Sequence, residues 1–248
     1  MFKLSKRLEA LGRLCEAGTV AADVGCDHGY LSIRLIREGI FSRMLAMDLR
    51  EGPLAAAREH VAEAGLSDRI ECRLSDGLRA MQTGEAEAVI CAGMGGPLMQ
   101  RILEQDIDKV RRMKQLVLQP QSDIGAFRRW LRENGFFTAA EDIVFEDGKY
   151  YPMMRVVTEA ADGMDSKRKA VSAGQDTDPE LADAFGPILL ERRHPVLLEY
   201  LKQRNGFVSK ALEQLDRAQR AGCDERRAQR MTELQHERKL IQKAISIF

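Results

Sequence analysis

The chain has 248 residues, of which 44% are hydrophobic, and its 38 Lys and Arg residues balance 38 Asp and Glu residues. This length and composition are enough for a substantial core, in one large domain or two modest ones, and they argue against a disordered chain. No stretch reaches the roughly 18 apolar residues of a membrane-spanning helix, and the charged opening segment lacks the apolar block of a secretory signal. We therefore expect a cytoplasmic protein that does not associate with membranes.

The five cysteines are scattered along the chain, without a Cys-x-x-Cys pair and without a His placed to complete a zinc site. We expect reduced thiols and no metal site. Cys91 lies inside an apolar run with no base next to it in the sequence, which disfavours a role as a nucleophile.

The first 135 residues show a regular alternation of predicted elements. Leucines at nearly helical spacing predict an amphipathic helix from Ser5 to Cys15. Beyond it we predict strands at residues 19–24, 44–47, 70–74, 88–92 and 116–118, and helices at residues 30–38, 53–64, 97–103 and 123–133. Such alternation predicts an α/β fold in which helices cover both faces of a parallel sheet.

The alternation ends with two extended runs, at residues 136–145 and 150–157, joined by Glu146-Asp147-Gly148-Lys149. Asp-Gly between such runs is a strong hairpin signal. A mostly parallel seven-stranded sheet that closes with an antiparallel hairpin is the plan of the Rossmann-like class I methyltransferases, an analogy of fold that does not by itself establish the chemistry. We expect residues 1–158 to form this domain.

The remaining residues differ in composition. Residues 159–180 are polar and predict a linker or loop. Residues 181–248 carry 13 Lys and Arg against 9 Asp and Glu, and their apolar residues follow a helical, partly heptad spacing on both sides of Gly222. This pattern predicts a C-terminal helical hairpin of coiled-coil type, and the alternative is a single bent helix packed on the first domain.

The most informative motif runs from Asp23 to Leu31, where the first strand passes into a helix. Gly25 and Gly29 allow the backbone to approach a ligand closely. Their Gly-x-x-x-Gly spacing differs from the dinucleotide pattern Gly-x-Gly-x-x-Gly. Asp27 inside the loop would repel a diphosphate but attract an ammonium or sulfonium cation. The motif favours S-adenosylmethionine, and a generic tight turn is the alternative.

Two acidic turns follow the next two strands. Asp48 stands about twenty residues beyond the glycines, where nucleoside-binding folds place a carboxylate that accepts hydrogen bonds from both ribose hydroxyls. Asp76, before Gly77, can accept a hydrogen bond from an adenine amine. Each could instead be a cap or turn residue. The carboxyl ends of neighbouring parallel strands meet in one crevice, so we expect the three turns to converge.

A fourth turn contains Gly93, Gly95 and Gly96 after the fourth strand. Three glycines would let a flat target lie beside the methyl donor, although a purely structural glycine loop is the alternative. The Asn/Asp-Pro-Pro-aromatic motif of enzymes that methylate exocyclic amines is missing from this place.

Taken together, these motifs resemble the TrmK family of bacterial tRNA (adenine-N1)-methyltransferases over nearly the whole chain. The resemblance rests on Leu4-Ser5-Lys6-Arg7-Leu8, Asp27-His28-x-Tyr30-Leu31, Gly52-Pro53, Asp76-Gly77, Ala92-Gly93-Met94-Gly95-Gly96, Leu116-Val117-Leu118-Gln119-Pro120 and Phe185-Gly186-Pro187. It implies a Rossmann-like catalytic domain, a C-terminal coiled-coil domain, S-adenosyl-L-methionine as cofactor, and methylation of adenine 22 in tRNA. Cys26, Gly29 and the polar 159–180 segment depart from the family pattern.

The resemblance also implies the site residues. The cofactor would contact Asp23, Gly25, Cys26, Asp27, His28, Asp48, Leu49, Gly52, Pro53, Asp76, Gly77, Leu78, Ala92, Gly93, Met94, Gly95 and Gly96. Asp27, His28 and Tyr30 would face the reaction centre as the catalytic set.

Three functions remain open from the sequence. The first is methylation of tRNA, with a monomeric enzyme favoured and with basic residues of the C-terminal helices on the RNA phosphates; these are Arg192, Arg193, Lys202, Arg204, Arg226, Arg227 and Arg230. The second is a Rossmann-like methyltransferase of a small molecule or protein, whose helices serve dimerisation. The third is a non-catalytic RNA-binding adaptor, which would bind without turnover.

Overall fold

A computed structural model of the chain describes residues 4–158, 177–219 and 225–248. The chain divides into two compact units, residues 1–175 and residues 176–248. Within the described ranges, no helix is both long enough and apolar enough to cross a membrane.

The first unit is built on a seven-stranded sheet in the order β3-β2-β1-β4-β5-β7-β6. Its strands are β1 (Gly18–Val24), β2 (Phe41–Asp48), β3 (Ile70–Leu74), β4 (Ala88–Met94), β5 (Gln115–Pro120), β6 (Phe137–Glu146) and β7 (Lys149–Val157). The first five strands pair in parallel, whereas β7 runs antiparallel to both β5 and β6. The predicted Rossmann-like fold with its closing hairpin is confirmed.

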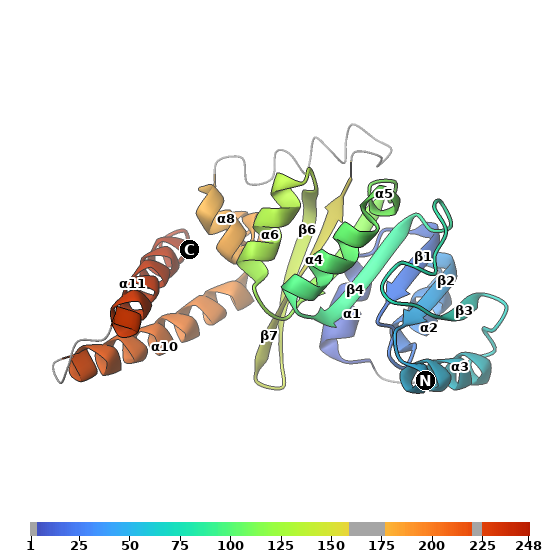
Figure 1. The fold of residues 1–248 in the computed structure, drawn as a ribbon, viewed down its shortest axis with the longest axis horizontal. Helices are drawn as coiled ribbons and strands as arrows, with labels where there is room; N and C mark the ends of the chain where they lie inside the picture. The colour runs from blue at the N-terminus through green and yellow to red at the C-terminus, as the bar shows by residue number, and fades with distance from the viewer. Residues whose placement is uncertain (1–3, 159–176, 220–224) are drawn as a thin grey trace. The chain divides into compact units, whose positions relative to one another are not determined.

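Helices cover both faces of this sheet (Figure 1). One core cluster joins the sheet to α1 (Lys6–Leu14), α2 (Tyr30–Arg37) and α3 (Glu51–Glu63). The other joins it to α4 (Gly96–Gln105), α5 (Ile107–Val110) and α6 (Ile124–Glu133). Every residue of β5 is buried, as a strand covered by helices requires. The sequence analysis missed α5, because four residues are too few to show a helical period.

The chain reverses direction across the sheet at β1, which pairs with β2 on one side and with β4 on the other. The connections after β1 and after β4 therefore leave on opposite faces. A crevice opens at such a point outside the carboxyl ends of the strands, and ligands of open α/β sheets bind there. The glycine-bearing turn after β1 and the glycine loop after β4 both lie at this edge.

The second unit is helical and consists of α8 (Pro179–Phe185), α9 (Pro187–Glu191), α10 (Pro195–Gln219) and α11 (Glu225–Ile245). The side chain of Asp178 caps α8 by accepting a hydrogen bond from the amide of Glu180, 2.9 Å away. The last residues of the predicted 159–180 linker therefore begin a helix, and residues 159–176 lie outside the described residues. The sequence analysis did not predict α8 and α9, whose five to seven residues carry little periodicity.

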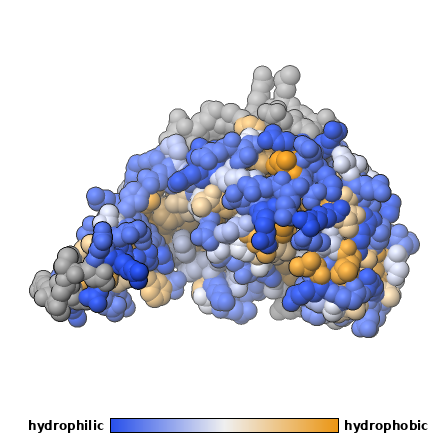
Figure 2. Space-filling model, in the orientation of Figure 1, coloured by the Kyte–Doolittle hydropathy of each residue, from blue (hydrophilic) through white to orange (hydrophobic). Residues whose placement is uncertain are grey.

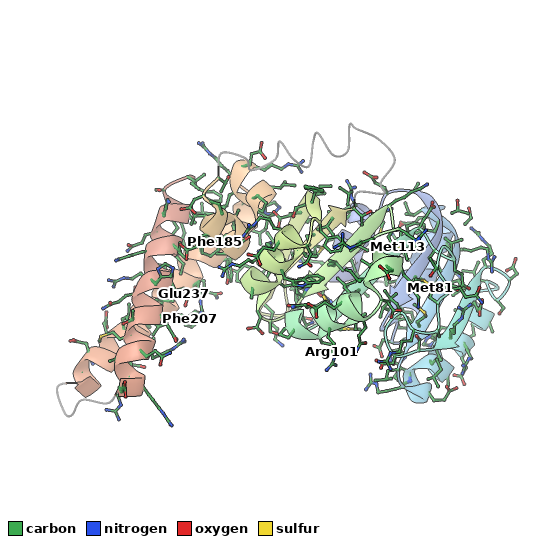
Figure 3. The ribbon with its side chains drawn as sticks, turned by 45° about the horizontal axis from the view of Figure 1, so that its top comes forward. Met81, Arg101, Met113, Phe185, Phe207 and Glu237 are labelled. Atoms are coloured by element: carbon green, nitrogen blue, oxygen red, sulfur yellow. The ribbon has the colours of Figure 1, made fainter. Side chains whose placement is uncertain are left out.

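The two long helices, α10 and α11, contact each other in an antiparallel arrangement. Their buried residues are Leu197, Leu201, Val208 and Leu212 on α10 and Leu234, Ile241 and Ala244 on α11. Arg204 of α10 forms a bidentate ion pair with Glu237 of α11, at 2.5 and 3.1 Å; Glu237 is labelled in Figure 3. The contact between the helices excludes a single bent helix. A coiled-coil supercoil stays a prediction, and Gly222 lies outside the described residues.

Each unit presents a mostly hydrophilic face in the view of Figure 2, with a few exposed hydrophobic side chains. Leu49 and Leu98 are 65% and 37% exposed and line the pocket described below. Phe207 on α10 is 59% exposed (Figure 3).

Candidate cofactor and substrate site

A pocket of about 570 Å³ opens at the carboxyl edge of the sheet. The turns after β1, β2 and β3 contribute to its wall, so the predicted convergence of these three turns is observed, and the last residues of β4 complete this side of the pocket. The predicted site residues in the wall are Asp23, Gly25, Cys26, Asp27, His28, Tyr30, Asp48, Leu49, Asp76, Gly77, Ala92, Gly93 and Met94. Five other predicted cofactor residues, Gly52, Pro53, Leu78, Gly95 and Gly96, do not line the pocket.

The turn between β1 and α2 has a backbone that ordinary residues adopt only under strain. Gly25 and Gly29 have φ values of +72° and +73°, and Asp27 between them has a φ of 51°. A Cβ atom on Gly25 would lie 2.2 Å from Cε of Met94, on the facing β4 side of the pocket. The absence of a side chain at residue 25 therefore lets the Met94 side chain lie against the turn after β1.

Asp48 ends β2 and is only 6% exposed, yet it borders the pocket. Its two carboxylate oxygens accept hydrogen bonds from the amides of Asp27 and Arg50, at 3.3 and 2.9 Å. Two backbone donors thus hold the carboxylate in one orientation while its remaining lone pairs stay available. This is the arrangement that a carboxylate needs to accept hydrogen bonds from two ribose hydroxyls.

Asp23 is a buried carboxyl at the floor of the pocket, 4% exposed. Burial raises its pKa to about 6, although the hydroxyl of Ser32, which donates to it at 2.7 Å, opposes the rise. The charge of Asp48 adds to the increase. Asp23 therefore changes its charge at a higher pH than an exposed aspartate.

The cysteines near the pocket are neutral thiols. Burial raises the pKa of Cys26 well above its ordinary value, and the surrounding aspartates raise it further. Burial likewise raises the pKa of Cys91 to about 12. Neither residue has the thiolate character of a nucleophile, which agrees with the sequence analysis for Cys91.

Asp76 follows β3 at the rim of the pocket. Its side chain is 50% exposed and pairs with the guanidinium of Arg79 at 3.2 Å. The next residue, Gly77, has a φ of +61°, and a Cβ atom there would lie 2.9 Å from Cγ2 of Ile102 on α4. Glycine at residue 77 therefore lets the turn after β3 pack close to α4, and this close packing places Asp76 at the opening.

The glycine loop after β4 depends on a contact that is distant in sequence. Gly93 has a φ of +80°, and its amide donates to Oε1 of Gln119 at 3.2 Å. The same oxygen accepts a hydrogen bond from the guanidinium of Arg7, at 3.0 Å. Gln119 is completely buried, whereas Arg7 lines the pocket. Arg7 and Gln119 belong to segments quoted for the family resemblance, but the sequence analysis gave neither a role.

The other two glycines of this loop have a packing role. The amide of Gly96 donates to the carbonyl oxygen of Ser122 at 3.0 Å. A Cβ atom on Gly96 would lie 2.7 Å from that oxygen, and one on Gly95 would lie 2.9 Å from Oγ of Ser122. These residues therefore let α4 begin close to the 121–123 segment, and neither glycine lines the pocket.

Three rings form a cluster beside the pocket, which we call the ring cluster: His28, Tyr30 and His60. The Tyr30 and His60 rings stack with centroids 4.6 Å apart, and His28 lies 5.9 and 5.8 Å from them. Nε2 of His28 lies 3.7 Å from a carboxylate oxygen of Asp27. His60 escaped the sequence analysis because it occupies an ordinary polar position of α3.

The charges around the pocket match a cationic nucleoside better than a diphosphate. Asp23, Asp27, Asp48 and Asp76 supply carboxyl groups from three turns, and Arg7, Arg50 and Arg101 stand among the lining residues. Arg101 extends from α4 (Figure 3). Carboxylates suit the ammonium and sulfonium groups and the ribose of S-adenosylmethionine. Within the described ranges, no group of three or more His, Cys, Asp or Glu could hold a metal ion.

Comparison with known proteins agrees with this geometry. The methyltransferase domain family matches residues 4–154. The tRNA (adenine(22)-N(1))-methyltransferase of Bacillus subtilis is 32% identical over 243 residues, which cover 98% of this chain and 97% of the relative. The crystal structure of the B. subtilis M1A22 tRNA methyltransferase TrmK has a TM-score of 0.86 and 30% identity, and the match covers 99% of this chain and all of the other.

A second solved structure contains the methyl donor. A protein of Streptococcus pneumoniae, in complex with S-adenosyl-L-methionine, has a TM-score of 0.80 and 29% identity, with 98% of this chain and 100% of the other covered. The relatives match both the sheet domain and the helices that follow it. The chain therefore belongs to the TrmK family of tRNA (adenine(22)-N(1))-methyltransferases.

Proposed function

We propose that this protein transfers the methyl group of S-adenosyl-L-methionine to N1 of an adenine in tRNA, at position 22 by its family. The observation that carries the proposal is the convergence of the turns after β1, β2 and β3 and of the end of β4 on one pocket with carboxylates and glycine backbone. The similarity to the B. subtilis enzyme over 98% of the chain supports the same substrate.

The acidic turns would hold the methyl donor. Asp48 would accept hydrogen bonds from the ribose hydroxyls, because two backbone amides already orient its carboxylate. Asp76 at the rim would accept from the adenine amine of the donor. When bound, the donor supplies an electrophilic methyl group on a sulfonium. The glycine loop at Gly93 would leave room for the target base beside it.

The target base would meet Asp27, His28 and Tyr30, the predicted catalytic set. Adenine N1 has an in-plane lone pair, so its attack needs no prior deprotonation, and positioning of the base dominates the catalysis. The ring becomes cationic as the methyl group is transferred, and the carboxylate of Asp27, 64% exposed, would stabilise that charge. His28 and Tyr30 offer ring faces for stacking with the base.

The decisive experiment is mass spectrometry of nucleosides from tRNA incubated with the pure protein and the methyl donor. We expect N1-methyladenosine in a tRNA transcript with adenine at position 22, and none in the same transcript with guanine there. Methyl transfer to a protein or small molecule but not to tRNA would favour the second function considered from the sequence. Binding of donor and tRNA without any product would favour the adaptor.

Asp27→Asn tests the electrostatic role within that reaction. The carboxamide keeps the size of the side chain and removes its charge, so we expect a slower single-turnover methyl transfer, by about 10²-fold. Normal transfer by the variant would exclude the role. The affinity for the donor, measured by calorimetry, shows whether the loss lies in chemistry or in binding.

The helical unit would contribute phosphate contacts to the tRNA. Arg192, Arg193 and Lys202 are exposed. Arg204, in contrast, forms an ion pair with Glu237 and is not included in the test. Replacing the three exposed residues by Gln in the full chain should weaken tRNA binding. It should also reduce the slope of the logarithm of the binding constant against the logarithm of the salt concentration by up to about three, because each lost phosphate contact lowers that slope by about one. An unchanged salt slope would exclude these contacts.

We further infer that the protein acts as a monomer in the cytoplasm, where tRNA is found. Light scattering of the pure protein, alone and with tRNA, tests the oligomeric state.

A further inference from the structure

His60 lies in the last turn of α3 and connects two residues of the proposed catalytic set. Its Nδ1 atom lies 3.0 Å from the backbone carbonyl oxygen of His28. Its Nε2 atom lies 3.2 Å from the hydroxyl oxygen of Tyr30, and the two rings stack. One imidazole therefore contacts the turn after β1 and the first residue of α2, which both border the pocket.

The two hydrogen bonds determine each other's direction. A carbonyl oxygen can only accept, so Nδ1 of His60 must carry the hydrogen and donate it to His28. In the neutral imidazole, Nε2 is then an acceptor, and the Tyr30 hydroxyl must donate to it. The hydrogen of the Tyr30 hydroxyl is thereby occupied, so its oxygen can only accept hydrogen bonds from any other group.

We propose that His60 is a positioning residue that presents the Tyr30 oxygen as a hydrogen-bond acceptor to the exocyclic amine of the target adenine. The proposal rests on the proposed function. As N1 gains the methyl group, the ring becomes cationic and its amine becomes a stronger donor. An acceptor fixed at this amine therefore interacts more strongly with the transition state than with the bound substrate, and this difference lowers the barrier.

A purely structural role for His60 would be to hold α3 against the turn after β1. Another contact already serves that purpose. A Cβ atom on Gly29 would lie 3.2 Å from Cβ of Ala57, so the turn and α3 are in close contact at Gly29 and Ala57. The side chains of α3 that are buried in the core are Leu54, Ala57 and Val61. His60 is not among them, and its hydrogen bonds are directed to residues of the pocket.

Two isosteric substitutions separate the two hydrogen bonds. In His60→Asn the amide nitrogen takes the place of Nδ1 and keeps the bond to His28, but this side chain is too short to reach Tyr30. In His60→Gln the longer side chain brings an amide oxygen to the place of Nε2, where it accepts from Tyr30. Asn and Gln are both tolerated in helices, so neither change should disrupt α3.

The experiment measures kcat and KM for tRNA, the donor affinity and the melting temperature for these two variants, for Tyr30→Phe and for the double variant Tyr30→Phe/His60→Asn. We expect His60→Asn to lower kcat about tenfold, as Tyr30→Phe does, and His60→Gln to restore most of the loss. The double variant should be no slower than Tyr30→Phe, because His60 acts through the Tyr30 hydroxyl.

Three results would overturn the proposal: additive losses in the double variant, equal losses in His60→Asn and His60→Gln, or a lower melting temperature that accounts for the lost activity. Turnover by the unmodified protein is measured in the same assay. Absence of any N1-methyladenosine from that protein would refute the proposed function itself, whereas normal turnover by His60→Asn would refute only the role of His60.

Discussion

The pocket has two halves that are built in different ways. The acidic half consists of the turns after β1, β2 and β3, and the glycine half consists of the loop after β4 with Arg7 and Gln119. In the acidic half the functional carboxylates are held by nearby backbone, as Asp48 is by the amides of Asp27 and Arg50. In the glycine half the buried side-chain amide of Gln119 links the loop to Arg7 of α1. Arg7 lies more than a hundred residues before Gln119 in the chain.

This difference separates two requirements of the reaction. A methyl donor with cationic groups and a ribose needs fixed carboxylates, which turns at strand ends supply locally. A target base needs open space and a firm wall, which on the proposed function the glycine half would supply through Gly93 and the bonds to Gln119. We therefore expect changes at Asp48 and Asp76 to affect donor binding, whereas changes in the glycine half, like those at Asp27, should affect turnover.

The largest expected effect is a change in the free energy of unfolding of the protein with pH, caused by Asp23 in the acidic half. The pKa of Asp23 is raised to about 6 by burial, above the value of 3.8 expected for the unfolded chain. Between these pH values the folded state holds a proton that the unfolded state has released, so the contribution of Asp23 to the free energy of unfolding falls as the pH rises. The total change is roughly 3 kcal/mol, complete just above pH 6.

Asp23→Asn removes this titration. We expect the variant to gain stability relative to the unmodified protein as the pH rises from 4 to 7, because only the unmodified protein must bury a charge at neutral pH. Urea unfolding of both proteins at several pH values measures the difference between their free energies of unfolding. The other titrating groups are the same in both proteins, so their contributions cancel in this difference. A difference independent of pH would show that Asp23 titrates normally.

The next effect is on donor affinity. Asp48→Asn places an amide group where two backbone amides and the ribose hydroxyls all need acceptors, so we expect the affinity for S-adenosylmethionine to fall by about 10- to 100-fold. Calorimetry measures the affinity. The control is Asp68→Asn, a change of the same type at an exposed aspartate just before β3. Equal affinities for both variants would place the ribose elsewhere.

The division of the pocket into an acidic half and a glycine half also explains how much of the site could be predicted from the sequence. The strands, the closing hairpin and the acidic turns follow from local patterns, and Asp27, Asp48 and Asp76 meet in one pocket as expected from parallel strands. The roles of Arg7, Gln119 and His60 depend on contacts between distant segments, which periodicity and turn chemistry do not record.

The glycines of the loop after β4 show a second limit. The sequence indicates that small residues are needed there, but it does not distinguish space for a ligand from space for packing. Gly93 lies in the pocket wall, whereas Gly96 is required because α4 begins against the carbonyl oxygen of Ser122. Only the fold separates these two uses of glycine.

The third prediction tests the long-range link of the glycine half. Gln119→Leu removes the acceptor of the Gly93 amide and of Arg7, so we expect the free energy of unfolding to fall by about 1–3 kcal/mol and kcat to fall about tenfold, with little change in donor affinity. Gln115→Leu is the matched control, because Gln115 is buried in the same strand and its amide binds the backbone of Glu16. We expect it to lose stability alone. A similar loss of kcat in both variants would mean that only stability matters.

The smallest effect separates backbone strain from crowding at the pocket. Gly93 and Gly39 have similar φ values, +80° and +70°, so alanine at either position should cost about 1 kcal/mol of stability. A Cβ atom on Gly93 would also lie 3.2 Å from Nη1 of Arg7, whereas one on Gly39 would have no neighbour within 4 Å. We expect Gly93→Ala to lower kcat/KM for tRNA about threefold to fivefold, because Arg7 must move, and Gly39→Ala to leave it unchanged. If both variants keep full activity, the wall formed by Gly93 and Arg7 does not contact the target base, and the glycine half has only a structural role.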